Sequence, residues 1–145
     1  MRKLARIMKF IKYNKNKRLM LKVLFYSGFY RFCILHVPAY KNKTRWGQAG
    51  EESPKEETDD NYRYAARVSH CVNRVCDHTL WESKCLVRAL TTQKLLSKKR
   101  IPTTMYLGCG KDDGKLIAHA WLRCGAYYFM GGDGTGYAMV EKFRK

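Results

Sequence analysis

The sequence has few acidic residues and no long apolar run. Of its 145 residues, 12 are Asp or Glu and 29 are Lys or Arg, so the formal net charge is +17. This excess favours an acidic partner, which could be nucleic acid, an anionic membrane surface or an acidic protein. Lys22 and Arg31 interrupt the apolar stretch near the N-terminus. The run left between them is too short to cross a membrane and marginal for a secretion signal.

Cysteine is also scarce, which argues against a disulfide scaffold. The chain has six cysteines, too few for its length, and with no secretion signal we expect reduced thiols in a cytoplasm. His70, Cys71, Cys76 and His78 are metal-ligand types close together, but their spacing matches no zinc pattern. We therefore expect these four residues to be structural, and we expect no metal or other cofactor.

The chain length fits one compact domain with a modest core. Within it we expect a basic helical region and an acidic linker over residues 1–60, followed by the main core over residues 61–145. The segment from Glu51 to Asp60 holds six of the twelve acidic residues and one lysine. This composition is typical of a solvated linker, here ending in an Asp cap for the next helix.

Two helices are predicted before this linker. Residues 1–18 are basic and weakly amphipathic, and fit either a membrane-surface helix or a solvated helix packed on its own domain. Their apolar residues at helical spacing are Leu4, Ile7, Met8 and Ile11. Residues 21–35 are predicted to form a second helix, with a stronger and aromatic-rich apolar stripe, and Pro38 ends it. Such a stripe is typical of a helix face that packs in the core or that docks another chain. Residues 41–50 read as an exposed loop.

The second half changes from helical to strand periodicity. Helices are predicted over residues 61–77 and 84–99, and strands over residues 105–109, 116–124, 126–130 and 137–143. Asp113-Gly114 indicates a hairpin between the first two strands. The fold class is therefore α+β, with N-terminal helices and then a helix packed on an antiparallel sheet. The loop Gly131 to Gly136 lacks the spacing of a dinucleotide-binding fingerprint.

Cys85 lies where a loop becomes a helix, in the run WESKCLVRAL. Ser83 is a plausible cap for this helix. A thiol at a helix N-terminus is favoured as thiolate by the helix dipole, which makes Cys85 a candidate nucleophile. The alternative is that Cys85 is a small buried apolar residue.

His119 and Asp133 follow Cys85 in chain order, which is the grouping that a cysteine nucleophile needs. His119 lies mid-strand in AHAW. A turn at Gly125-Ala126 would place it opposite Gly132, next to Asp133. His119 would act as base and Asp133 would orient it, although a structural histidine and a turn-forming aspartate are the plain alternatives. The N–H of Cys85 is a natural oxyanion donor, with Trp81 and Trp121 as further positioning candidates.

WESKCLVRAL, LLSKKRIPTTMYLGC, AHAWLRCG with the following GG, and the closing YAMVEKF together resemble a known family. This family is the leader peptidase of lasso-peptide biosynthesis, the stand-alone protease half of the split B protein. The resemblance covers Trp81 to Phe143, with a weaker echo in Tyr26 to Pro38 and Trp46 to Glu52. It implies a transglutaminase-like or papain-like core with a Cys85–His119–Asp133 triad.

The resemblance also implies a function and partners. The substrate would be a ribosomally made precursor peptide, cut between leader and core in a bacterial cytoplasm during antibiotic maturation. A separate asparagine-synthetase-like, ATP-dependent cyclase would then close the freed core amine onto an acidic side chain. Because residues 1–80 show no winged-helix pattern, we expect a small separate leader-binding protein to deliver the substrate. The basic surface and the helix over 21–35 are the candidate docking surfaces.

Two other functions fit parts of the sequence. Transglutaminase-like acyl transfer would use the same residues, because an amine can intercept the acyl-enzyme in place of water. A basic protein that binds nucleic acid or a membrane surface would explain the charge. It would leave the order of Cys85, His119 and Asp133 unexplained, and no nucleic-acid-binding motif is present.

Overall fold

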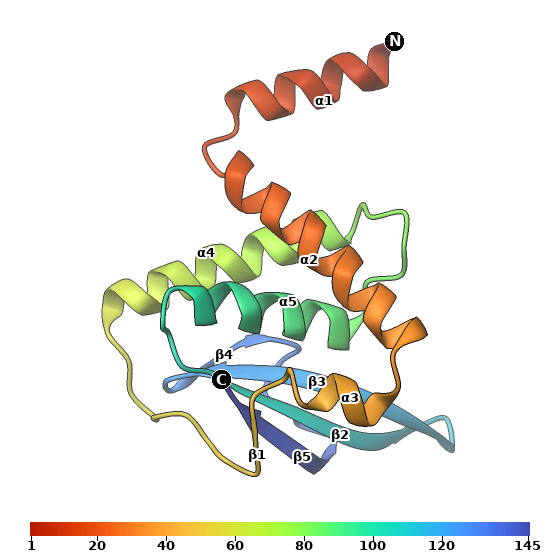
Figure 1. The fold of residues 1–145 in the computed structure, drawn as a ribbon, viewed down its shortest axis with the longest axis vertical. Helices are drawn as coiled ribbons and strands as arrows, with labels where there is room; N and C mark the ends of the chain where they lie inside the picture. The colour runs from red at the N-terminus through yellow and green to blue at the C-terminus, as the bar shows by residue number, and fades with distance from the viewer.

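The chain folds into helices stacked on one face of an antiparallel sheet (Figure 1). The computed structural model describes the backbone of residues 1–145 and every side chain except those of Ile7, Phe10 and Ile11. Helix α5 lies directly over the sheet, α4 and α2 pack above it, and α1 projects away from the rest of the molecule. The helices are α1 (Arg2–Tyr13), α2 (Lys17–His36), α3 (Ala39–Lys43), α4 (Asp59–Cys76) and α5 (Cys85–Lys98). The predicted α+β class is confirmed.

The sheet has five strands in the order β1-β5-β2-β3-β4, all antiparallel. The strands are β1 (Gln48–Ala49), β2 (Thr104–Asp112), β3 (Lys115–Cys124), β4 (Tyr127–Met130) and β5 (Ala138–Arg144). The predicted hairpin is confirmed, since β2 and β3 pair without a register shift and turn at Asp113-Gly114. Because β4 and β5 are not neighbours, the connection through residues 131–137 has to cross β3 and β2. It does so on the face away from the helices, against the Trp121 indole.

Most predicted elements lie within a few residues of the observed ones, and two short ones were missed. Residues 41–50, predicted as a loop, contain the end of α3 and all of β1, which pairs with β5. The predicted Asp cap of α4 is wrong: Thr58 is the N-cap, and its hydroxyl accepts a hydrogen bond from the Asn61 N–H at 3.2 Å. Asp59 and Asp60 instead occupy the first helical turn, where their charge suits the helix dipole.

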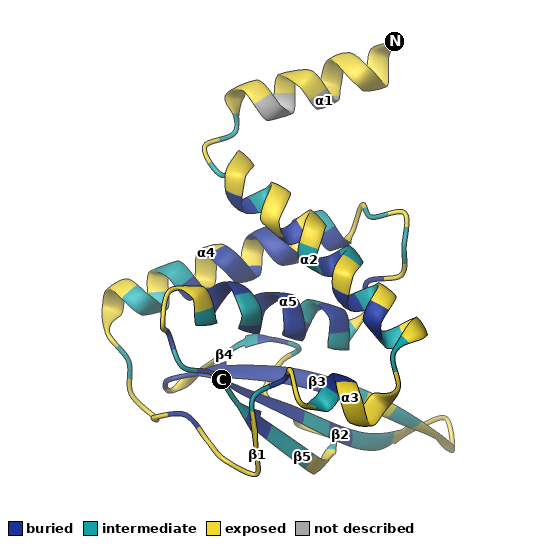
Figure 2. Cartoon of the chain, viewed as in Figure 1, coloured by how far each residue is buried: buried dark blue, intermediate teal, exposed yellow. Residues whose placement is uncertain are grey.

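Helix α2 buries a different stripe from the one that the apolar spacing suggested. Its buried residues are Leu19, Val23, Ser27, Tyr30 and Cys33. The aromatic stripe predicted as core or docking face is largely exposed, as the yellow segments of α2 in Figure 2 show. Its exposed members are Leu21, Leu24, Phe25, Phe29, Phe32 and Leu35. The core interpretation of this stripe is therefore wrong, and the docking interpretation stays a prediction.

Helix α1 confirms the helical part of the prediction for residues 1–18. Leu4 and Met8 of its apolar stripe are exposed. The side chains of Ile7 and Ile11 lie outside the described residues.

A buried arginine ties the acidic linker to the sheet. Arg123 on β3 is only 6% exposed, and its guanidinium donates to the carbonyls of Ser53 and Pro54 at 3.0 and 3.1 Å. It also donates to the Gly125 carbonyl at 2.6 Å and to the Tyr106 hydroxyl at 3.1 Å. A buried charge is tolerated when it is hydrogen-bonded in this way. The start of the linker is therefore docked on the sheet.

Candidate active site

Cys85 is the first residue of α5, as the sequence predicted. The N-cap is Lys84, and no side chain caps the helix, so the Ser83 cap prediction is wrong. The Ser83 hydroxyl lies 2.9 Å from that of Thr79 instead. The Arg88 N–H makes the first helical bond, to the Lys84 carbonyl at 3.1 Å. The N–H groups of the first turn, including that of Cys85, therefore have no acceptor within the helix and can donate hydrogen bonds to an anion.

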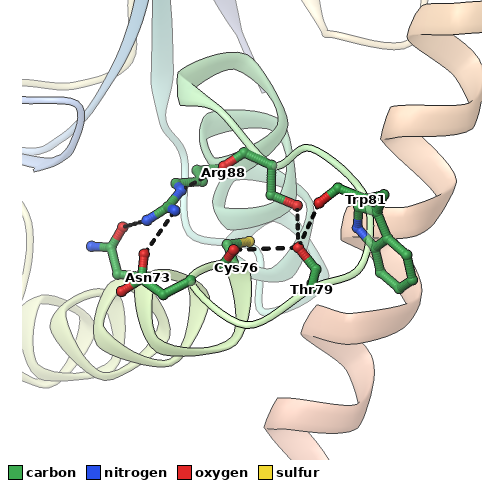
Figure 3. Close-up of polar contacts among 7 residues, drawn as sticks. Asn73, Cys76, Thr79, Trp81 and Arg88 are labelled. Carbon is green, nitrogen blue, oxygen red and sulfur yellow. Dashed lines mark hydrogen bonds and ion pairs between the residues drawn. The ribbon is translucent and has the colours of Figure 1, made fainter.

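The loop before Cys85, residues 77–84, is held by hydrogen bonds to both flanking helices (Figure 3). Arg88 on α5 donates to the Ser83 carbonyl at 2.8 Å, the Asn73 side chain at 3.0 Å and the Asp77 carboxylate at 2.8 Å. The Thr79 hydroxyl contacts the carbonyls of Cys76 and Trp81. These bonds fix where α5 begins, and with it the position of the Cys85 thiol.

Replacing Arg88 by methionine should loosen this loop. The change removes three hydrogen bonds from a partly exposed side chain, so we expect a loss of about 1 kcal/mol in the free energy of unfolding. Amide hydrogen exchange in residues 79–84 should become faster, as mass spectrometry can measure. Arg63→Met is the control, because Arg63 makes an exposed pair with Asp60 at 3.4 Å. Equal exchange in the two variants would contradict the bracing role of Arg88.

His119 projects from β3 onto the connection that crosses the sheet. Its Nε2 atom lies 2.6 Å from the Gly131 carbonyl oxygen. Its ring stacks on Tyr137, with centroids 4.5 Å apart, and more distantly on Trp121 at 6.0 Å. The imidazole is thus half-buried among groups from β3 and the β4–β5 connection.

Asp133 is exposed and bonds within its own loop. Its Oδ1 atom accepts from the Thr135 hydroxyl at 2.6 Å and from the Thr135 N–H at 2.9 Å, and these bonds hold the pKa of Asp133 below its usual value. The turn at Gly125-Ala126 is present, but β3 and β4 shift register between Leu122 and Arg123. Regular pairing ends at Met130, so the expected pairing of His119 with Gly132 does not form.

Cys85 and His119 lie in different surroundings, the first beside the core beneath the helices and the second beside Tyr137 and Trp121. Neighbouring residues of a strand face opposite sides of the sheet, and Ala120 and Leu122 belong to the core beneath the helices. Cys85 is half-buried and packs against that same core, whereas His119 contacts groups on the other face. Among the described side chains, no hydrogen bond joins the Cys85 thiol, the His119 ring and the Asp133 carboxylate to one another.

The two tryptophans proposed as positioning residues lie apart. Figure 3 shows the Trp81 side chain directed toward α2, where its ring packs over Gly28. The buried Trp81 indole N–H has no partner among the described residues. Trp121 is buried on the far face of the sheet, stacked on Tyr106 with centroids 5.6 Å apart.

Three groups at these sites were missed from the sequence. The Gly131 carbonyl belongs to the main chain, and its residue type gives no signal. Tyr137 was counted only as a strand residue. Arg88 lies three residues after Cys85 in a predicted helix, and that spacing could have marked it as a neighbour of the same helical turn.

Neither a metal site nor a membrane span is found in the part of the chain that the structure describes. No group of three or more His, Cys, Asp or Glu side chains is placed to hold an ion there. None of the helices searched there is long and apolar enough to cross a membrane.

Comparison with known proteins decides the family. A family model described as the Transglutaminase-like superfamily matches residues 35–144, which is most of the chain. The chain belongs to the Transglutaminase-like superfamily. No curated protein and no solved structure matches it. The superfamily consists in general of cysteine proteases and acyltransferases, and it accounts for helices followed by an antiparallel sheet. The match begins in α2 and includes Cys85, His119 and Asp133.

Proposed function

We propose that this superfamily member is a cysteine peptidase that removes the leader from a lasso-peptide precursor. The observation that carries the proposal is Cys85 at the uncapped start of α5, inside the matched residues. The unpaired N–H groups of the first helical turn can bind an oxyanion that forms beside this thiol. The motifs around Cys85 and His119 support the leader-peptidase assignment within the superfamily.

The proposed reaction has two steps. The Cys85 thiolate attacks the carbonyl carbon of the scissile peptide bond, and the Cys85 N–H stabilises the resulting oxyanion. The C–N bond then breaks, and the His119 imidazolium gives its proton to the leaving amine of the core peptide. Water, deprotonated by His119, attacks the thioester. This step releases the leader as a carboxylic acid and restores the thiol.

The reaction requires the Cys85 Sγ atom and the His119 ring to meet. Catalytic hydrogen bonds are often absent or long before substrate binds. We therefore propose that the two groups meet only when substrate is bound.

Product analysis separates peptidase from acyltransferase. The protein would be incubated with precursor peptide, the leader-binding protein and an excess of a primary amine, and the products weighed by mass spectrometry. We expect a leader ending in a free carboxylate and a core with a free amine. A leader carrying the added amine would instead favour transglutaminase-like acyl transfer, and an uncut precursor would overturn the peptidase proposal.

We further propose that the exposed face of α2 docks the small leader-binding protein, ahead of a separate ATP-dependent cyclase that uses the freed core. Leu21, Leu24, Phe25, Gly28, Phe29 and Phe32 of this face, together with Trp81, line an open apolar groove. Trp81 belongs to the loop that leads into Cys85, so a partner seated here would touch the segment that positions the thiol. Contact of residues 1–18 with an anionic membrane surface stays a prediction, as does the absence of nucleic-acid binding.

Changing Phe25 to serine should weaken this docking. Phe25 is 66% exposed in the free protein, so the change should leave the fold intact. If the partner buries this ring, the dissociation constant should rise by about tenfold or more, measured by titration calorimetry. Leu116→Ser is the matched control, because Leu116 is similarly exposed but lies on β3. Equal affinities for Phe25→Ser and the unmodified protein would exclude this surface.

A further inference from the structure

The bond between His119 and Gly131 fixes which ring nitrogen carries the proton. The His119 Nε2 atom lies 2.6 Å from the Gly131 carbonyl oxygen. A carbonyl oxygen only accepts hydrogen bonds, so Nε2 must donate its hydrogen. In the neutral ring the lone pair is then on Nδ1, which becomes the nitrogen able to take a proton.

Aromatic contacts hold the ring in this orientation. Tyr137 stacks on the imidazole with an interplanar angle of 25°, and Trp121 lies at 21° to it. One hydrogen bond and two ring contacts therefore restrict both the tilt of the imidazole and the direction of Nδ1.

The Gly131 carbonyl is held in place by a backbone that only glycine fits. Gly131 has a φ of +76°, and an added Cβ would collide with the Ala120 carbonyl oxygen and crowd the Trp121 backbone. Gly132 has nearly the same φ, +79°, but a Cβ there would meet nothing within 4 Å. Asp133, in contrast, is exposed and bonded to Thr135.

We infer that the main-chain carbonyl of Gly131 is the group that orients His119, in place of the Asp133 carboxylate. Gly131 is thus a positioning residue that keeps the Nε2–H form of His119 and leaves Nδ1 as the base. The catalytic importance of this orientation rests on the proposed peptidase function. The tautomer and its cause do not, because they can be measured without any substrate.

Nitrogen-15 NMR of the histidine side chains tests this directly, with the His119 signal assigned by comparison with His119→Gln. We expect the unmodified protein and Asp133→Asn to show the same Nε2–H tautomer. Gly131→Ala should shift His119 toward a mixture of tautomers, while Gly132→Ala, which carries the same backbone strain, should leave it unchanged. A Nδ1–H tautomer in the unmodified protein, or loss of the Nε2–H form in Asp133→Asn, would overturn the inference.

Cleavage assays of the same variants test the functional part. We expect Gly131→Ala to slow cleavage by about tenfold or more, and Asp133→Asn to stay within about twofold of the unmodified protein. A large loss in Asp133→Asn with an unchanged tautomer would show that the carboxylate acts in the reaction, against the inference. If Cys85→Ala cleaves normally while the NMR result holds, the peptidase proposal fails and the orientation of His119 by Gly131 stands.

Discussion

Replacement of Cys85 by alanine should abolish leader removal while the protein stays folded. Losing the nucleophile removes the thioester route altogether, so the cleavage rate should fall by about three orders of magnitude or more. The side chain is small and half-buried, and the rest of the core cluster is unchanged. Circular dichroism and the thermal midpoint should therefore stay close to those of the unmodified protein.

Cys109→Ala is the matched control for this experiment. Cys109 is also a half-buried free thiol, but it lies on β2 and not at a helix N-terminus. The Cys109→Ala protein should cleave the precursor at a rate close to that of the unmodified protein. Normal cleavage by Cys85→Ala would exclude Cys85 as the nucleophile, and equal losses in both variants would show that Cys85 is only structural.

The largest expected effect on stability comes from Arg123→Leu. The change leaves the carbonyls of Ser53, Pro54 and Gly125, together with the Tyr106 hydroxyl, without the cation that they bind. Because buried acceptors without partners are costly, the free energy of unfolding should fall by about 3–5 kcal/mol. Urea denaturation measures the change, and limited proteolysis should begin in the released linker near Ser53.

Arg144→Leu serves as the control for the buried arginine. Arg144 lies at the end of β5 and pairs with Glu51 at 3.8 Å in a partly exposed position. The Arg144→Leu change should lower the free energy of unfolding by less than about 1 kcal/mol, since surface ion pairs contribute little. Similar losses in the two variants would contradict the role of Arg123 in docking the linker.

The spacing of apolar residues, together with the residues that end helices or form turns, predicted most of the fold, because these signals are local in the sequence. The change from helical to strand spacing after Pro102 and the Asp113-Gly114 turn both correspond to observed elements. The buried side of α2 could not be predicted in the same way, since apolar residues lie on both of its faces. Val23 became core, and Phe25 remained exposed, through packing against α4 and α5.

The candidate site was predictable only where one residue and its local helix define it. The position of Cys85 follows from its place at the start of α5. The surroundings of His119 depend on the register shift after Leu122 and on a connection that crosses two strands. The hydrogen-bond partner of His119 is a main-chain carbonyl, and its position cannot be predicted from the type of residue that carries it. Strand alternation does predict that His119 shares a face with Trp121, opposite Ala120, and the contact between the two rings agrees with it.

The most direct measurement is the mass of the protein during turnover. Precursor and leader-binding protein would be mixed with the enzyme, quenched in acid within the first turnovers and analysed as intact protein and as peptides. We predict a covalent adduct on Cys85 whose added mass is that of the leader acyl group, absent from Cys85→Ala and replaced by free leader at later times. Precursor cleavage without any adduct on Cys85, or an adduct on another cysteine, would contradict a Cys85-dependent peptidase.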